Sequence, residues 1–203
     1  MLAAARMYPR PTLADNSENK EKSVRAFRAK MCANIKQSAV IHEKRSFRMN
    51  DFSTRKRIRL QGYDYTQNNY YFVTICTYEK LQIFGIGNQL TDFGRIAENC
   101  LYRIQGIFPG VRIDKYVVMP NHVHAIVVFE RNSQARMYAC PTLGTVIGNY
   151  KAAVSRGIHL IDPKIKVWQK RYYDHIIRGQ KDYEIIWTYI DENPVKWESD
   201  EYY

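Results

Sequence analysis

The sequence predicts an α+β domain of the ferredoxin-like kind, in which helices pack on an antiparallel sheet. Segments rich in β-branched and aromatic residues alternate with segments of helical periodicity, in the order strand, helix, strand, strand, helix, strand, helix. The two central strands also flank Pro120-Asn121, a turn signal that predicts an antiparallel hairpin. Helices interleaved with such a hairpin are typical of this fold class.

The first four elements are predicted between residues 70 and 130. YYFVTICTY, residues 70–78, is rich in β-branched and aromatic side chains and predicts a buried strand. A helix is predicted to begin at Thr91-Asp92, and its apolar residues keep helical spacing until Phe108-Pro109-Gly110 ends it. VRIDKYVVM, residues 111–119, and HVHAIVVFE, residues 122–130, supply the hairpin.

The last three elements complete the pattern. A helix is predicted at about residues 143–156, and VWQKRYYDHIIRG, residues 167–179, is predicted to be strand-like or extended. DYEIIWTYIDEN, residues 182–193, predicts a final helix. Asp182 is its expected N-cap and Pro194 its expected stop.

Length and composition narrow the class of protein. A chain of 203 residues suffices for one domain with a core, or for a modest domain with a tail. Its apolar stretches are too short for a membrane span, and the first residues do not resemble a secretory signal. The four cysteines lie far apart without a C-x-x-C pair, so neither a zinc knuckle nor a disulfide framework is indicated. We therefore expect a soluble, cytoplasmic protein.

The positive charge is concentrated near the N-terminus. Residues 1–60 contain 15 Lys and Arg against 5 Asp and Glu, whereas residues 61–203 contain 16 against 15. Residues 1–48 show no sustained periodicity and predict a basic extension that is disordered or weakly helical. The folded domain is expected over residues 49–203. Because Met49 is a plausible start, residues 1–48 either belong to the protein or lie upstream of it in the reading frame.

A histidine pair is the main candidate site. His122 and His124 are two residues apart at the head of a predicted strand, so their side chains point to the same face of the sheet. Both could be structural histidines satisfied by backbone or water. Two imidazoles on one side directly after a turn favour metal binding instead. His175 could approach the same site, although a structural role is the simpler interpretation.

The final predicted helix offers further groups for this site. Tyr189 and Asn193 are four residues apart and would share one face of that helix. The direction of Asn193 stays open because the residue precedes Pro194. Tyr189 could instead pack its ring against the sheet. Tyr150 lies in another predicted helix and has no metal-binding side chain four residues on, so it ranks below Tyr189.

Two basic segments are candidate contacts for nucleic acid. One precedes the first strand and could equally be a solvated leader. The other interleaves cations with Trp168, Tyr172 and Tyr173, and could equally be an amphipathic edge strand with its aromatic rings turned inward. The candidate cations are Arg55, Lys56, Arg57 and Arg59 in the first segment, and Lys170, Arg171 and Arg178 in the second.

Five segments together carry a resemblance to a known family. They are RIRLQGYDYTQNNYYFVTICT, VVMPNHVHAIVVF, LGTVIGNYKAAVSR, VWQKRYYDHIIR and YIDENPVKW. In this order the chain resembles the REP-associated tyrosine transposases, which belong to the single-tyrosine transposases of the His-hydrophobe-His (HUH) endonuclease superfamily. The resemblance covers about residues 55–198 and excludes residues 1–48.

The resemblance implies a catalytic domain within residues 49–203 that cuts and rejoins single-stranded DNA, usually near a hairpin. It implies that His122 and His124 hold Mg²⁺ or Mn²⁺, and that Tyr189 is the nucleophile that forms a 5′-phosphotyrosine intermediate. Asn193 would be the third metal ligand, at a position where many insertion-sequence relatives have Gln. Asn is one methylene shorter than Gln, which is a departure from the pattern of those relatives.

Two other functions stay open at the level of sequence. A nucleic-acid-binding module of the same fold would need no catalysis, and the intact set of His122, His124 and Tyr189 argues against it. A metal-dependent nuclease that activates water would keep the histidines and dispense with the tyrosine. The sequence is compatible with a monomer and with a homodimer that completes each site from a partner subunit.

Overall fold

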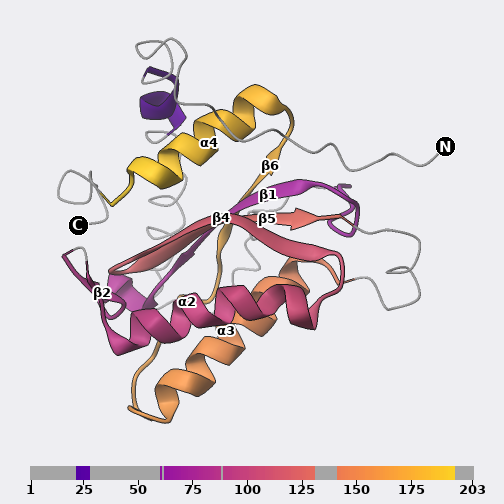
Figure 1. Ribbon diagram of the computed structural model, residues 1–203. Helices are drawn as coiled ribbons and strands as arrows, with labels where there is room; N and C mark the ends of the chain where they lie inside the picture. Colours follow the sequence, from indigo (N-terminus) through magenta and orange to yellow (C-terminus); the bar gives the residue numbers. More distant parts are fainter. Residues whose placement is uncertain (1–21, 28–59, 61, 88, 131–140, 195–203) are drawn as a thin grey trace, which may run out of the picture.

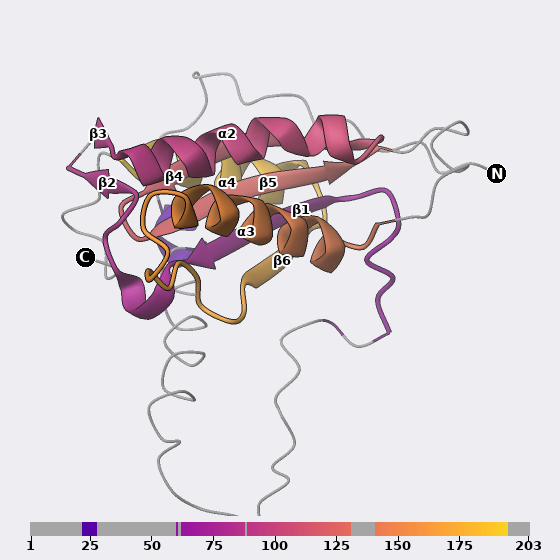
Figure 2. The same cartoon turned by 90° about the horizontal axis from the view of Figure 1, so that it is seen from below.

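The computed structural model describes residues 22–27, 60, 62–87, 89–130 and 141–194 (Figure 1). A four-stranded antiparallel sheet lies between two helical layers: two long helices cover one face and the C-terminal helix covers the other (Figures 1 and 2). This arrangement confirms the predicted α+β class. None of the helices in the described part of the chain combines the length and apolar character that a membrane span requires.

The sheet consists of β1 (Tyr70–Cys76), β4 (Val111–Met119), β5 (His122–Phe129) and β6 (Tyr173–Ile177). Their order is β4-β5-β1-β6, and each neighbouring pair is antiparallel. The predicted hairpin is confirmed as β4 and β5. Each of the seven residues of β1 is buried, because this strand has a strand on either side and helices on both faces.

Two short elements were not predicted. β2 (Gly85–Ile86) and β3 (Gln89–Leu90) form a separate two-stranded ribbon, and η1 (Tyr78–Lys80) is a single 3₁₀ turn after β1. Strands of two residues are too short to show an alternating pattern in the sequence. Of the predicted extension, residues 22–27 are helical and the remaining residues lie outside the described part.

Three long helices match the predicted ones. They are α2 (Asp92–Ile107), α3 (Leu143–His159) and α4 (Gln180–Glu192). Thr91 and Thr142 cap the first two, since each hydroxyl accepts a hydrogen bond from a backbone N–H three residues on. The regular spacing of apolar residues therefore predicted these helices to within a few residues.

The prediction that Asp182 is the N-cap of α4 was wrong. The helix begins two residues earlier, at Gln180, with Gly179 as its N-cap. The carboxylate of Asp182 accepts hydrogen bonds from the backbone N–H of Arg178 (3.2 Å) and from Nε2 of His175 (2.8 Å). A carboxylate in the first turn that bonds back to the preceding chain stabilises a helix start much as an N-cap does.

Loss of this carboxylate is expected to destabilise the protein in a pH-dependent way. Burial acts to raise the pKa of Asp182, but the hydrogen bonds from His175 and Arg178 lower it below its usual range. A carboxyl with a lowered pKa contributes stability above its unfolded pKa, and this is lost as the pH falls through the folded pKa. Urea titration of Asp182→Ala should show a loss of about 1 kcal/mol at pH 7. A difference from wild type that does not shrink on acidification would contradict this account.

The two faces of β5 belong to different cores. Val123, Ala125, Val127 and Phe129 pack in the larger core beneath α2 and α3. The alternate residues of the strand face α4, where Ile126 and Val128 join a smaller core. The same alternation places His122 and His124 together on the α4 side, as predicted from their spacing.

The start of α2 is packed closely against the segment that supports the β4–β5 turn. A Cβ added at Gly94 would lie 2.0 Å from the carbonyl oxygen of Phe84, and the N–H of Phe84 donates to the carbonyl of Pro120 (2.9 Å). Gly94→Ala is therefore expected to destabilise the protein by about 1–3 kcal/mol despite the helix propensity of Ala.

Gly106, in the same helix, is the matched control. A Cβ at this position would meet nothing within 4 Å, so Gly106→Ala should stabilise the protein by about 0.5–1 kcal/mol. Chemical denaturation of both variants measures the difference. If both substitutions changed the stability equally, the carbonyl of Phe84 would not limit the size of the side chain at position 94.

Candidate active site

The histidine pair lies at the start of β5, on the face that α4 covers. His122 and His124 are both fully buried, and their ring centroids are 4.4 Å apart. In the sheet His124 lies opposite Thr74 of β1, and His122 lies opposite Cys76. The structure thus brings the two imidazoles together on one face, as the spacing predicted.

Each imidazole is oriented by a hydrogen bond at its Nδ1 atom. His122 Nδ1 lies 2.7 Å from Oδ1 of Asn121, and His124 Nδ1 lies 2.8 Å from the hydroxyl of Thr74. An amide oxygen only accepts hydrogen bonds, so His122 donates from Nδ1 and its lone pair is on Nε2. The hydroxyl of Thr74 can accept from His124 in the same manner.

The environment keeps His122 neutral. Burial, and to a smaller extent the charge of Lys80, lower the pKa of His122 to about 3. Lys80 belongs to the turn after β1, in which both Lys80 (φ 58°) and its neighbour Glu79 (φ 48°) have the left-handed backbone conformation. Neutral imidazole is the form that binds metal ions, so the ring is in the required state at physiological pH.

Tyr189 of α4 reaches the histidine pair within the same chain. Its hydroxyl lies 3.1 Å from Nε2 of His124, and its ring packs edge-on against that imidazole with centroids 5.1 Å apart. The side chain is fully buried. The phenol therefore packs on its own sheet and also touches the site, so no second subunit is needed to bring the two groups together.

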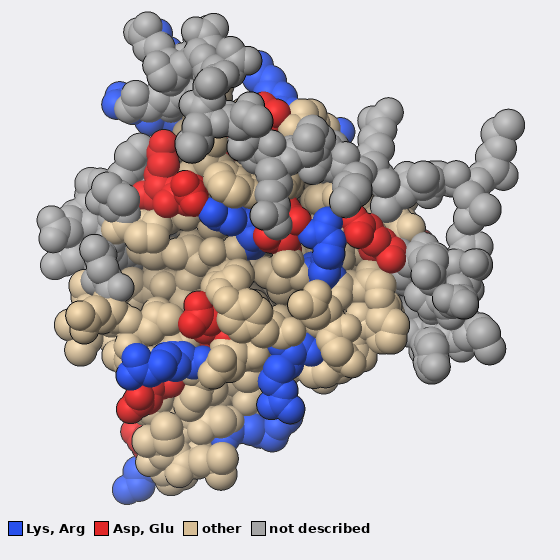
Figure 3. All heavy atoms as spheres, viewed as in Figure 1, with Lys and Arg blue, Asp and Glu red and all other residues tan. Residues whose placement is uncertain are grey.

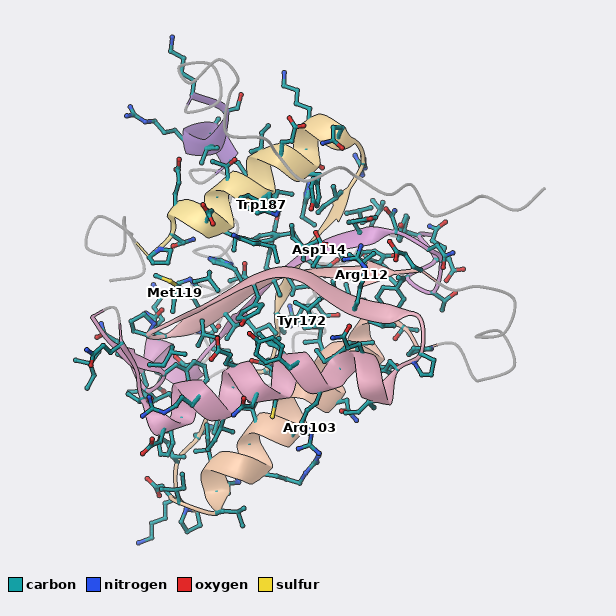
Figure 4. The ribbon with its side chains drawn as sticks, in the orientation of Figure 1. Arg103, Arg112, Asp114, Met119, Tyr172 and Trp187 are labelled. Atoms are coloured by element: carbon teal, nitrogen blue, oxygen red, sulfur yellow. The ribbon has the colours of Figure 1, made fainter. Side chains whose placement is uncertain are left out.

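Polar contacts hold α4 onto the edge strand β4. The hydroxyl of Tyr183 donates to Asp114 (2.5 Å), and the ammonium of Lys115 lies 3.8 Å from the ring centroid of Trp187. The same ammonium pairs with Asp191 at 2.5 Å. Trp187 and Asp114 can be followed in Figure 4 between α4 and the sheet. These contacts hold the helix against β4, whereas the ring of Tyr189 is held separately by its packing against His124 and Phe72.

The direction of α4 brings Asn193 level with His122. Tyr183 packs on the first residue of β1 (ring centroids 5.8 Å apart), which lies beside the end of β5, whereas Tyr189 packs on His124 near its start. The helix therefore runs antiparallel to β5. Four residues along the helix and two residues along the strand each span about 6 Å, so the step from Tyr189 to Asn193 matches the step from His124 to His122.

Asn193 keeps a helical conformation in spite of the following proline. Its φ and ψ are −57° and −44°, and the side chain is fully buried. Neither amide atom has a hydrogen-bond partner among the described residues. A buried amide without partners costs free energy, so a ligand that binds this oxygen would relieve the cost.

A cavity of about 350 Å³ adjoins this end of the site. It lies between the β2–β3 ribbon, β4 and the end of α4, and Met119, labelled in Figure 4, forms part of its wall. Pro120 and Pro194 also line it, next to the segments that hold His122 and Asn193. The site is thus closed at the tyrosine and bordered by a cavity at the other end.

The other candidate residues lie elsewhere. Tyr150 is buried in the core on the opposite face of the sheet, where its hydroxyl donates to the carbonyl of Ala97 (3.2 Å) and burial raises its pKa well above the usual range. Trp168 packs on Phe84 (5.1 Å between centroids) and donates to the carbonyl of Lys151. The ring of Trp168 is therefore turned inward, as expected for an amphipathic edge strand and not for a surface that stacks on nucleic acid. Tyr172 likewise packs on the α2 side of the sheet (Figure 4).

The candidate cations are only partly described. Lys170, Arg171 and Arg178 are exposed around the edge strand β6. On the face shown in Figure 3, Lys and Arg side chains are interspersed with Asp and Glu, in keeping with the balanced charge of residues 61–203. The cluster Arg55, Lys56, Arg57 and Arg59 lies outside the described residues.

Several residues of the site were not predicted. Thr74 and Phe72 of β1 contact His124, the latter by stacking with centroids 5.3 Å apart. Their contact depends on the register of two strands that are separated by about 50 residues. Asn121 could have been found, because it directly precedes His122.

The fold and the site together define a ferredoxin-like domain in which a His-x-His strand faces a tyrosine on the C-terminal helix. No family model matches the chain. The chain is 38% identical over 167 residues to an uncharacterized protein of Haemophilus influenzae, a match that covers 73% of this chain and 93% of that protein. It belongs to the same family as that protein.

Two further matches concern transposases. The chain is 24% identical over 136 residues to a Haemophilus influenzae protein named as a candidate REP-associated tyrosine transposase, covering 66% of this chain and 74% of that protein. A solved REP-associated tyrosine transposase bound to a REP hairpin has the same fold, with a TM-score of 0.53 and 21% identity over 68% of this chain and 74% of that one. The resemblance that the sequence motifs indicated is thereby confirmed.

Proposed function

We propose that the protein is a transposase that cuts and rejoins single-stranded DNA through a covalent bond between Tyr189 and a 5′-phosphate. The observation that carries this proposal is the 3.1 Å contact between the Tyr189 hydroxyl and Nε2 of His124 in a buried polar site. Packing alone would not require a phenol to meet an imidazole at this place. The transposase among the relatives and the REP hairpin bound to the solved neighbour support the same substrate class.

The residues of the site fit a divalent cation, Mg²⁺ or Mn²⁺. His122 and His124 would bind it through Nε2, and Asn193 through an amide oxygen that has no other partner among the described residues. At His124 the ion would replace the hydrogen bond to the Tyr189 hydroxyl, which would free that hydroxyl for the phosphate. In the described ranges there is no group of three His, Cys, Asp or Glu that could hold a metal, so DNA oxygens and water would complete the shell. When bound, the ion neutralises charge on the attacked phosphate.

The side chains of this site would perform a transesterification. The phenol oxygen of Tyr189 forms a bond to phosphorus as the bond from phosphorus to the 3′-oxygen breaks. The phenol gives up its proton and the departing oxygen gains one, which leaves a free 3′-hydroxyl. Attack by a 3′-hydroxyl on the phosphotyrosine reverses the step, so strand transfer needs no nucleotide cofactor.

Basic residues would hold the DNA outside the reacting centre. We assign this role to Lys170, Arg171 and Arg178 at the β6 edge, which are exposed, and to the cluster of Arg55, Lys56, Arg57 and Arg59. The partner would be single-stranded DNA beside a hairpin.

A labelled oligonucleotide tests the proposal. A single strand with a hairpin is incubated with the full chain and Mn²⁺, and the products are separated in denaturing detergent. A 3′-end label should migrate with the protein and a 5′-end label should be released, because Tyr189 retains the 5′-phosphate. Peptide mapping should place the adduct on Tyr189. Cleavage without adduct would favour a nuclease that activates water, and binding without cleavage a non-catalytic module.

The hydrogen bond from Thr74 provides a second test of the metal site. Thr74→Val has nearly the same shape but cannot orient the His124 ring, so the affinity for Mn²⁺ is expected to fall about 10- to 100-fold. Thr74→Ser keeps the hydroxyl and should retain most of the affinity. Calorimetric titration with Mn²⁺ measures both variants, and equal affinities would remove Thr74 from the site.

A further inference from the structure

The side chains of the candidate active site are buried, including those at the end that borders the cavity. The side chains of Tyr189, His122, His124 and Asn193 are each fully buried. If Tyr189 attacks a DNA phosphate, its hydroxyl must touch that phosphate and the neighbouring nucleotide must lie against the same face. Some part of the cover must therefore leave before DNA can bind.

The N-terminal helix (residues 22–27) forms part of this cover. It lies next to α4 (Figure 1), and Val24 and Phe27, three residues apart on one face of the helix, pack into the smaller core. Val24 is 2% exposed. The contact comes from a segment that lies before the ferredoxin-like domain in the sequence.

Phe27 makes edge-to-face contacts with three aromatic rings of the site. The ring centroid of Phe27 lies 5.5 Å from that of Tyr189, 5.7 Å from Phe72 and 5.8 Å from His175. These three residues belong to α4, β1 and β6, so the phenylalanine is surrounded by walls from three separate elements. His175 is itself held by Asp182 and forms a fixed wall.

The N-terminal helix is the cover that can move without dismantling the site. The strands and α4 carry the histidines, Tyr189 and Asn193, whereas residues 22–27 contribute none of these groups. The described residues 22–27 are held on this face in part by the apolar contacts of Val24 and Phe27, so their position depends on that packing. Weakening the contacts of Phe27 should therefore favour their release.

We infer that Phe27 occupies a nucleobase subsite beside Tyr189, and that the N-terminal helix and single-stranded DNA compete for it. This inference rests on the proposed function and adds a binding site and its ligand class, an unpaired base. Aromatic side chains bind unpaired bases in many single-strand-binding proteins, and the flat ring of Phe27 fills the space that a base would take. In the described arrangement this subsite is filled by Phe27.

A binding experiment without chemistry tests the competition. In a Tyr189→Phe background, which cannot form the adduct, Phe27→Ala is expected to raise affinity for a short unpaired oligonucleotide about tenfold, because the closed form no longer reduces the competent population. Phe27→Leu, which keeps an apolar contact but removes the ring, should give a smaller gain. Fluorescence anisotropy with a labelled oligonucleotide measures all three.

Ala26→Ser, on the exposed side of the same helix, is the control and should leave the affinity unchanged. Unchanged or weaker binding in Phe27→Ala, with an unaltered melting temperature, would overturn the inference. If Phe27→Ala does not fold, the test uses Phe27→Leu, and unchanged or weaker binding by that variant would overturn the inference. If Phe27→Ala binds the oligonucleotide more tightly but the wild-type chain forms no adduct, the subsite is supported and the proposed chemistry is rejected.

Discussion

Tyr189→Phe is expected to abolish the detergent-stable DNA adduct and to lower strand cleavage by about four orders of magnitude or more. Phenylalanine keeps the ring in its place between His124 and Phe72 and removes only the oxygen that would bond to phosphorus. Loss of a nucleophile usually removes nearly all of the rate that depends on it. Quantification of cleaved and protein-linked oligonucleotide over time measures the effect.

Tyr183→Phe is the matched control for this prediction. Tyr183 is a second buried tyrosine of α4, and its hydroxyl donates to Asp114 away from the histidine pair. Each substitution removes one hydrogen bond, so both variants should lose about 1 kcal/mol of stability and remain folded. Adduct formation that survives in Tyr189→Phe and fails in Tyr183→Phe would show that the wrong tyrosine was assigned.

His122→Ala is expected to eliminate Mn²⁺ binding and to reduce cleavage by about 10²- to 10³-fold. This histidine is the better choice of the pair, because His124 also touches Tyr189 and its loss would disturb the nucleophile as well. A metal site left with one imidazole and one amide would hold the ion too weakly to counter the charge of the phosphate. Calorimetry without DNA and cleavage across a range of Mn²⁺ concentrations measure the two effects.

His159→Ala serves as the control for the loss of an imidazole. His159 ends α3 on the other side of the sheet, where its Nε2 contacts the carbonyl of Ile165 at 2.9 Å. Its removal should change neither metal binding nor cleavage. Metal-stimulated cleavage of normal rate in His122→Ala would mean that the ion is bound elsewhere.

Much of the fold could be predicted because its elements are long and regular. The apolar runs of β1, β4 and β5 and the spacing in α2 and α3 are strong local signals. The same alternation was sufficient to place His122 and His124 on one face. The two-residue strands β2 and β3 carry no such signal, and the start of α4 was misplaced because Asp182 acts from inside the first turn.

The contacts around the site depend on tertiary structure and could not be predicted in the same way. Thr74 meets His124 because of strand register, and Trp168 turns inward because α3 offers a carbonyl to its indole. Phe27 lies far from the motifs in the sequence, in a stretch with few large apolar residues. Among the described residues 22–27 only Val24 and Phe27 pack into the core, and two apolar residues are too few to form a periodic pattern.

The antiparallel sheet separates two cores of different size. The larger side holds two long helices and most of the apolar side chains, whereas the smaller side holds the polar groups beneath α4 and the N-terminal helix. Proteins open locally in cooperative units, and a layer with fewer buried apolar side chains opens at lower cost. A substrate could then enter by displacing part of the smaller layer, while the larger layer kept the strands and their imidazoles in place. The side of β5 that opens to the substrate is thus opposite the side that keeps the strand rigid.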